Sequence, residues 1–171
     1  MKNLRIPKHK IIDPAGKKFW PLYMGRDCAR TPMQWSGKPN AGFSTGKLWL
    51  PVDMDYRKTN VKNSKKDRYS LLNFYRNLIR IRRKHPALMY GEWKPLYKGV
   101  TGVLAYYRQY ENDILCVVLN FTSKDRRFRT DNRAQWKVLL SSHRCKNEHY
   151  LDLDFVLNPY EATLLEKINN F

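Results

Sequence analysis

Hydrophobic residues between positions 70 and 83 recur at the spacing of an amphipathic helix. Leu71, Tyr75 and Leu78 fall on one face of this helix, and most arginines of the segment fall on the others. Pro86 follows shortly afterwards, and proline cannot continue a helix interior. The pattern therefore predicts a helix over residues 70–83 that packs its apolar face inward and ends before Pro86.

Beyond residue 93 the pattern changes to short hydrophobic runs that are typical of β-strands. Residues 114–120 are almost continuously apolar, which predicts a central strand covered on both faces. Residues 111–113 before this run have the composition of a hairpin turn. Further strands are expected at residues 103–107, 136–140 and 162–166, the last after a turn at 158–161. Many short strands joined by turns predict a small antiparallel β-sandwich, so the fold class is α+β.

Residues 25–43, with the sequence GRDCARTPMQWSGKPNAGF, show neither the hydrophobic period of a helix nor the alternation of a strand. Proline, asparagine and glycine near the end of this stretch favour a turn. Met33, Trp35 and Phe43 are large apolar residues that we expect to anchor a long loop. A loop of this length in a compact domain is usually functional.

Three charged residues make this loop the candidate site, namely Arg26, Asp27 and Arg30. A guanidinium held near a carboxylate makes rigid, bidentate contacts. Polar groups beside aromatic faces suit a sugar, which offers hydroxyl groups on its rim and C–H groups on its faces. The alternative is that the three residues only pin the loop through ion pairs, and the residue pattern leaves both possibilities open.

Composition and charge narrow the range of partners. The chain has 171 residues, of which 42% are hydrophobic and 28% charged, as in globular proteins. The net charge of +18 invites a nucleic-acid interpretation, but the basic residues are scattered and no nucleic-acid motif accompanies them. No nucleic-acid partner is therefore predicted. No apolar run approaches the roughly 20 residues that span a bilayer, and no secretory signal follows Met1.

The spacing of the cysteines and histidines predicts neither a disulfide nor a metal site. Cys28, Cys116 and Cys145 are odd in number and form no CxxC motif, which favours free thiols in a reducing, cytoplasmic compartment. The four histidines show no metal-ligand spacing. His143 and His149 flank Cys145, but no second cysteine pair completes a zinc site there. No metal and no cofactor are predicted.

A set of motifs in the first half of the chain resembles a known family. GRDCARTPMQWS is followed by NAGFST, then LWLPV at residues 48–52, Asn60-Val61, and SLLNFYRNLIRIRRKHPAL at residues 70–88. In this order they resemble the α-glucosidase branch of the α-amylase superfamily, glycoside hydrolase family 13. The resemblance implies that residues 1–90 are the incomplete C-terminal end of a (β/α)8 TIM barrel including its last helix. Residues 91–171 would then be the C-terminal all-β domain of that family.

The resemblance also implies a function. The family includes retaining glycoside hydrolases that cleave α-glucosidic bonds of oligosaccharides, such as oligo-1,6-glucosidases and maltases. Its nucleophile, acid/base and third aspartate lie in motifs upstream of the matched region, so no catalytic residue is expected in this chain, which alone should be inactive. In this interpretation Arg30 and Arg26 bind the sugar of an α-linked gluco-oligosaccharide, and Asp27 orients them.

Two alternatives remain open on the sequence. The chain could derive from a relative of the trehalose synthase or sucrose isomerase type, because these enzymes share the motifs. It could also be a non-catalytic interaction protein, since some relatives of this family serve as partners of membrane transporters.

Overall fold

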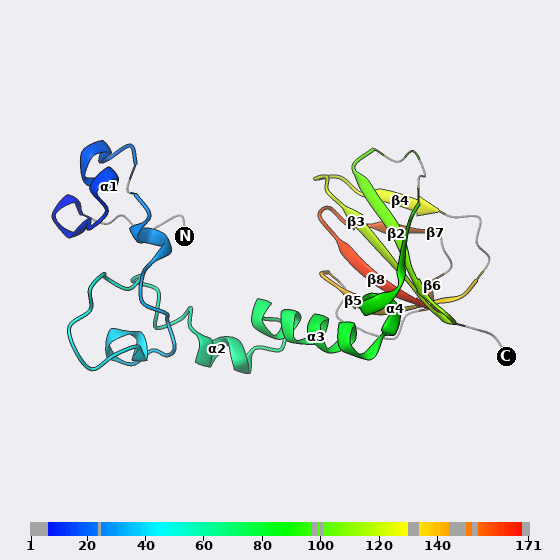
Figure 1. Ribbon diagram of the computed structural model, residues 1–171, viewed down its shortest axis with the longest axis horizontal. Coiled ribbons are helices and arrows are strands. Elements are labelled where there is room, and N and C mark those ends of the chain that lie inside the picture. Colours follow the sequence, from blue (N-terminus) through cyan, green and yellow to red (C-terminus); the bar gives the residue numbers. More distant parts are fainter. Residues whose placement is uncertain are drawn as a thin grey trace. The chain divides into compact units, whose positions relative to one another are not determined.

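The computed structural model describes residues 7–23, 25–96, 99, 101–129, 134–143, 150–151 and 154–168. The chain divides into two compact units, Met1–Phe74 and Tyr75–Phe171, called here the N-terminal and the C-terminal unit (Figure 1). Each unit is described separately.

Short helical turns joined by loops make up the described part of the N-terminal unit. Helix α1 begins after Asp13, whose side chain accepts the backbone N–H groups of Ala15 and Gly16. Helix α2 begins after Asn60, whose side chain accepts the N–H of Asn63 at 2.9 Å. The elements are the 3₁₀ turns η1 (Lys8–Lys10), η2 (Asp27–Ala29) and η3 (Pro39–Gly42) and the helices α1 (Pro14–Phe19) and α2 (Val61–Lys66).

The helix predicted from periodicity is confirmed as α3 (Leu71–Lys84). Ser70 caps it, because its hydroxyl accepts the N–H of Asn73 at 3.2 Å. The predicted inward packing of Leu71, Tyr75 and Leu78 is wrong, since Leu71 is 71% exposed, Tyr75 is 55% exposed, and no residue of α3 is buried. A periodic apolar face is buried only where another element covers it, and periodicity does not supply that element.

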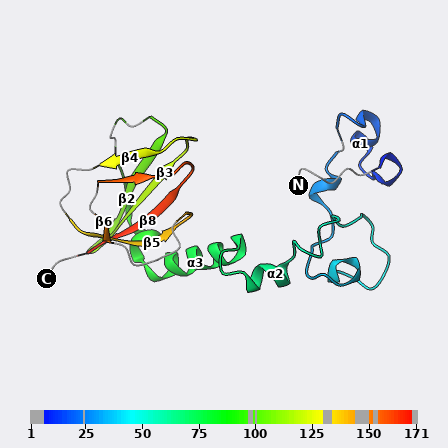
Figure 2. The ribbon, with the colours of Figure 1, turned by 180° about the vertical axis from the view of Figure 1, so that it is seen from behind.

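Antiparallel strands form two sheets in the described part of the C-terminal unit, as predicted. The larger sheet has the order β1-β2-β3-β8-β5-β6, and β4 pairs with β7 in a second, two-stranded sheet (Figures 1 and 2). Residues 111 and 112 form the tight turn between β2 and β3, since Tyr110 pairs with Asp113. The elements are α4 (Pro86–Tyr90), β1 (Glu92–Pro95), β2 (Val103–Tyr110), β3 (Asp113–Asn120), β4 (Arg126–Arg129), β5 (Trp136–Ser141), β6 (Tyr150–Leu151), β7 (Asp154–Leu157) and β8 (Ala162–Lys167).

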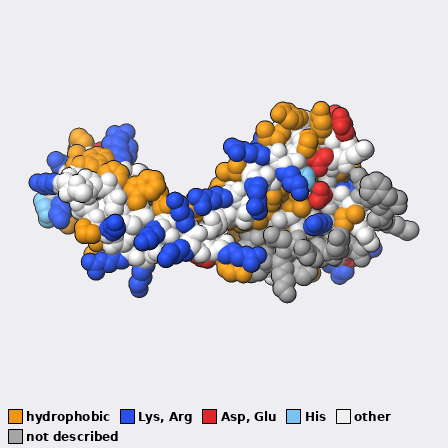
Figure 3. All heavy atoms as spheres, turned by 90° about the horizontal axis from the view of Figure 1, so that it is seen from below, with side chains coloured by type: hydrophobic (Ala, Val, Ile, Leu, Met, Phe, Trp, Pro, Cys, Tyr) orange, Lys and Arg blue, Asp and Glu red, His pale blue; other side chains and the backbone are white. Residues whose placement is uncertain are grey.

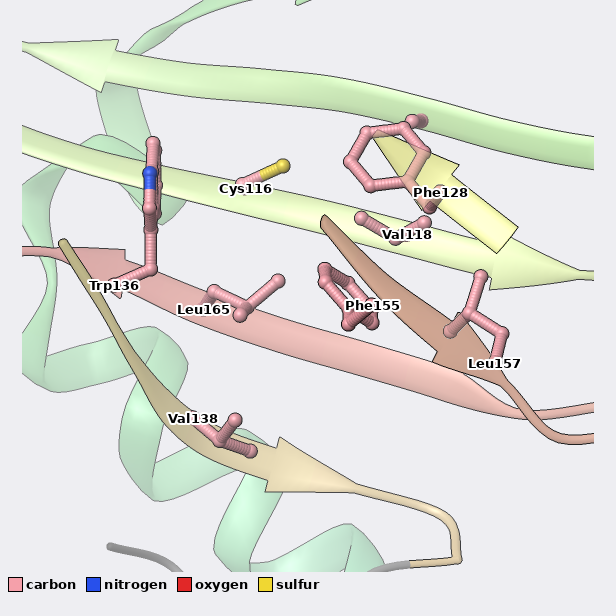
Figure 4. Close-up of a cluster of buried hydrophobic side chains, with 9 residues drawn as sticks. Cys116, Val118, Phe128, Trp136, Val138, Phe155, Leu157 and Leu165 are labelled. Carbon is pink, nitrogen blue, oxygen red and sulfur yellow. The ribbon is translucent and has the colours of Figure 1, made fainter. Parts of the chain in front are cut away.

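One hydrophobic cluster joins the two sheets (Figure 4). Phe128 of β4 and Phe155 of β7 pack with their ring centroids 5.6 Å apart, and both belong to this cluster. The larger sheet contributes Ala105, Cys116, Val118, Trp136, Val138 and Leu165. The mixed helical and antiparallel architecture predicted from sequence is therefore present.

Strand β3 is central, because it pairs with both β2 and β8. Its two faces are not equally buried, however. Cys116 and Val118 are fully buried in the cluster, whereas Val117, which points to the opposite face, is only partly buried. The expectation that both faces are covered along the whole strand is therefore wrong at Val117. Helix α4 packs against β2 and β3, but it is only five residues long and covers part of the sheet.

Candidate functional site

Asp27 lies inside the loop at residues 25–43 rather than on its surface. It is 1% exposed, and its Oδ2 accepts the backbone N–H groups of Ile12 at 2.6 Å and of Asp13 at 3.1 Å. The expectation that Asp27 orients the two arginines is not what the structure shows. Its carboxylate instead fastens the preceding segment of the chain to the loop.

Asp13 is the partner of Arg26 and was not identified as a site residue from the sequence. Its Oδ2 accepts both the backbone N–H and the Nε–H of Arg26, at 3.1 and 3.2 Å. These hydrogen bonds, the backbone one first, lower the pKa of Asp13 to about 2, helped by the N–H groups of Ala15 and Gly16. Asp13-Pro14 is visible in the sequence as a helix start, but its contact with Arg26 depends on the fold.

Gly25 allows this network to form. It has a φ of +70°, and a Cβ built on it would lie 2.7 Å from the Cβ of Asp13 and 2.8 Å from its Cγ. A side chain at this position would therefore be strained in its backbone and would also collide with Asp13. The glycine that begins the GRD motif thus lets the loop backbone lie directly against the Asp13 side chain.

Arg26 and Arg30 both face solvent. The side chain of Arg26 is 69% exposed although its Nε contacts Asp13. Arg30 ends η2, and its backbone N–H bonds to the carbonyl of Asp27 at 2.9 Å. Within the residues that the structure describes, the Arg30 guanidinium makes no hydrogen bond or ion pair, so all of its donors are available to a ligand.

The second half of the loop turns through three successive left-handed residues, Asn40, Ala41 and Gly42, with φ values of 53°, 57° and 66°. The Ala41 carbonyl accepts the N–H groups of Trp35 and Ser36 at 2.9 Å each. Left-handed non-glycine residues cost energy and persist only where the surroundings hold them. This part of the loop is therefore a strained turn fixed by backbone hydrogen bonds.

The large apolar residues of the loop are not its buried anchors. Met33, Trp35 and Phe43 are each about half exposed, whereas Ala41 and Pro32 are buried. The expectation that Met33, Trp35 and Phe43 hold the loop is therefore wrong. A long loop can be ordered by hydrogen bonds to its own backbone, which hydrophobic patterning does not reveal.

The loop is also fastened to helix α2. The carbonyls of Gln34 and Trp35 accept the first N–H groups of that helix, from Val61 at 2.9 Å and Lys62 at 3.0 Å. The side-chain amide of Gln34 donates to the Thr59 carbonyl at 3.0 Å. Helix N-termini have unpaired N–H groups, so this arrangement satisfies two of them. The Arg26–Arg30 segment thus lies between two fixed points of the loop, at residues 25–27 and at Gln34 and Trp35.

The chemistry of this loop is that of binding and positioning. Asp13 is ionised at neutral pH and is occupied by four N–H groups, so it cannot act as a general acid. Arg26 and Arg30 offer planar arrays of N–H donors. The loop can therefore hold hydroxyl or anionic groups of a ligand through Arg26 and Arg30.

Comparisons with known proteins agree with the motifs. A family profile described as "Alpha amylase, catalytic domain" matches residues 1–91. The oligo-1,6-glucosidase of Parageobacillus thermoglucosidasius is 35% identical over 143 residues, which are 82% of this chain and 25% of that protein. The oligo-1,6-glucosidase of Bacillus cereus is 33% identical over 171 residues, 97% of this chain and 31% of that protein.

Solved structures also show similarity to enzymes of this kind. The crystal structure of a trehalulose synthase mutant in complex with Tris superposes with a TM-score of 0.72 at 33% identity, covering 84% of this chain and 26% of that one. The chain thus spans between a quarter and a third of the length of these proteins.

The strained loop, the helix after it and the antiparallel sheets therefore define a relative of the glycoside hydrolases. The chain belongs to the α-amylase family, glycoside hydrolase family 13. Among the described residues, no helix is both long and apolar enough to cross a membrane.

Proposed function

We propose that this chain is the C-terminal portion of a retaining glycoside hydrolase that acts on α-glucosidic bonds of oligosaccharides. Residues 1–90 would be the end of the (β/α)8 barrel and residues 91–171 its C-terminal all-β domain. The two oligo-1,6-glucosidases named above, which the chain matches over most of its own length, support this assignment. The catalytic carboxylates would come from the part of the barrel that precedes the matched region.

The loop at residues 25–43 carries this proposal. Arg30 presents a free guanidinium on a segment fixed by Asp13, Asp27 and helix α2. Fixed donors lower the entropic cost of orienting a substrate, so Arg30 would bind a sugar hydroxyl next to the scissile bond. Arg26 would assist from its exposed face. Asp27 would contribute indirectly, by holding the loop rather than by contacting the sugar.

The test joins the chain to the upstream barrel segment that the proposal requires and measures hydrolysis of a chromogenic α-glucoside. The 171-residue chain alone should release no glucose, because retaining cleavage needs two carboxyl groups about 5 Å apart. In the joined protein, Arg30→Ala should lower kcat/KM by roughly two orders of magnitude or more. Arg26→Lys should have a smaller effect.

Arg57→Ala is the matched control, since Arg57 is an exposed arginine of the same unit outside the loop. An unchanged kcat/KM in Arg30→Ala would exclude the sugar-binding role of Arg30. Glucose release by the 171-residue chain itself would exclude the proposal that the catalytic carboxylates come from an upstream segment.

An isomerase of sucrose is the second candidate, because the superposed structure is that of a trehalulose synthase. Product analysis separates the two functions. A hydrolase incubated with isomaltose or sucrose releases free glucose, whereas an isomerase converts sucrose into another disaccharide. The free thiols of Cys28 and Cys116 support a cytoplasmic location for either enzyme.

A further inference from the structure

Three potential metal ligands from separate elements meet on one face of the larger sheet. His85 immediately precedes helix α4, Asp113 is the first residue of β3, and Glu166 lies in β8. Glu166 pairs in register with Leu115 of β3, two residues after Asp113, so both carboxylates lie on the same face. Because His85 and Asp113 are 28 residues apart in the chain, local sequence spacing could not reveal this cluster.

The distances suit a small tetrahedral cation. The Nδ1 atom of His85 lies 3.0 Å from Oδ1 of Asp113 and 3.9 Å from Oε1 of Glu166. One ligand atom from each residue lies within 4.8 Å of the others. Zinc bonds of about 2.0–2.1 Å in a tetrahedron place neighbouring ligand atoms roughly 3.3 Å apart. Small side-chain rotations would therefore bring all three atoms to bonding distance.

Charge balance at the cluster also favours a cation. A single imidazole Nδ1 can donate one proton, yet two carboxylates face it. In the described residues, neither Asp113 nor Glu166 forms an ion pair with a lysine or arginine. Lys137 is opposite Glu166 in the register of β5 and β8 but forms no ion pair with it. A dication would neutralise both carboxylates, whereas a protonated histidine neutralises one.

The ligands are held before any ion binds. His85 is 7% exposed, and the second oxygen of Asp113 accepts the N–H of Ala87 at 2.9 Å. A hydrogen bond of this kind orients a ligating carboxylate and is typical of the surroundings of protein metal sites. The guanidinium of Arg108 is directed to the carbonyls of Ala87 and Gly91, so it does not compete for the carboxylates.

We propose that His85, Asp113 and Glu166 bind a divalent transition-metal ion, with Zn²⁺ the best match. One imidazole and two carboxylates form a three-ligand set that leaves a fourth position for water. An imidazole ligand disfavours Ca²⁺ and Mg²⁺, which prefer oxygen. The ion would fasten the start of α4 to two central strands of the sheet and so stabilise the C-terminal unit.

Calorimetric titration of the EDTA-treated 171-residue chain with ZnCl₂ at pH 7.5 tests the proposal. One ion per chain should bind, and a saturating concentration should raise the melting temperature, because a ligand that binds the native state stabilises it. Glu166→Gln and His85→Asn should each weaken binding by about tenfold or more. Co²⁺ in place of Zn²⁺ should give the visible absorption of a tetrahedral site, and Glu166→Gln should reduce it.

His143→Ala is the matched control, because His143 is another histidine of the C-terminal unit and is not part of the proposed cluster. Binding should be unchanged in this variant. Loss of binding in His143→Ala with full binding in Glu166→Gln would overturn the proposal, as would no binding up to about 100 μM, which is weak for a zinc site. Circular dichroism checks that each variant is folded. If His85→Asn does not fold, zinc binding by Glu166→Gln alone decides the outcome, because Glu166 is partly exposed.

Discussion

At the scale of single residues, Gly25 of the candidate loop lies directly against the side chain of Asp13. Asp13 accepts four N–H groups, and Gly25 leaves the space in which it does so. Asp27 accepts two more N–H groups, those of Ile12 and of Asp13 itself. Two buried carboxylates thus replace the hydrophobic anchors that patterning suggested, and both are satisfied by backbone donors.

Gly25→Ala should destabilise the N-terminal unit. The left-handed backbone alone costs about 1–3 kcal/mol with a side chain, and the contact with Asp13 adds to this. Gly46→Ala is the control, since a Cβ there would meet only Ser44 Oγ at 3.7 Å. Urea denaturation followed by tryptophan fluorescence measures both variants. Equal stability of the two would contradict the close packing of Gly25 on Asp13.

Asp13 should also make the stability of the N-terminal unit depend on acid. Its pKa falls from 3.8 to about 2 on folding, so its contribution is fully present above pH 4 and is lost as the pH falls toward 2. Asp13→Asn should therefore lower stability at neutral pH and flatten the curve between pH 4 and 2. Denaturation at a series of pH values measures this, with Asp125→Asn as the control carboxylate. A wild-type curve that is already flat over this range would contradict the assignment.

The two sheets of the C-terminal unit depend on each other at the scale of elements. Strands β4 and β7 form only a two-stranded sheet, which is marginal in water without further packing. Phe128 and Phe155 cover the larger sheet and complete its core (Figure 4). A part-buried hydrogen bond adds to this, because the side-chain amide of Asn120 in β3 donates to the Asn158 carbonyl just after β7 at 2.8 Å.

Phe128→Ala should destabilise the C-terminal unit by about 3–5 kcal/mol, the usual cost of removing a buried aromatic ring. Phe128 is 1% exposed, whereas Phe121, a few residues earlier, is 64% exposed. Phe121→Ala should therefore change stability by about 0.5 kcal/mol or less. Thermal denaturation monitored by circular dichroism compares the two. Similar effects in both variants would mean that β4 and β7 do not cover the larger sheet.

At the scale of the whole molecule, basic residues greatly outnumber acidic residues. The chain has 33 lysines and arginines and 15 aspartates and glutamates. Basic side chains are spread over the face seen in Figure 3, with few acidic ones between them. Such a surface attracts polyanions without sequence preference, and this attraction weakens steeply with salt.

Filter binding of duplex DNA tests the prediction that nucleic acid is not a partner. Some retention of DNA on the filter is expected at about 0.02 M salt and none at about 0.15 M. The reason is that salt screens the attraction between scattered basic side chains and DNA phosphates. Heparin as a competitor should abolish the low-salt retention. Retention of DNA at physiological salt would contradict this prediction and show that the basic residues form a nucleic-acid-binding surface.

The sequence by itself determined the family, one helix and four of the strands. The helix at residues 70–83 and the strands at 103–107, 114–120, 136–140 and 162–166 are present, because periodicity, proline and turn residues act within a few positions of each other. The family rests on a long ordered set of motifs and is confirmed by the matched relatives. The sugar-binding roles of Arg26 and Arg30 and the domain boundary at residue 90 stay predictions.

Only the tertiary structure decided which residues meet. Asp13 rather than Asp27 pairs with Arg26, and Leu71 and Tyr75 remain exposed although their spacing predicts burial. His85, Asp113 and Glu166 converge from distant parts of the chain. Local propensity depends on near neighbours, whereas burial and long-range hydrogen bonds depend on what the whole fold places opposite each side chain.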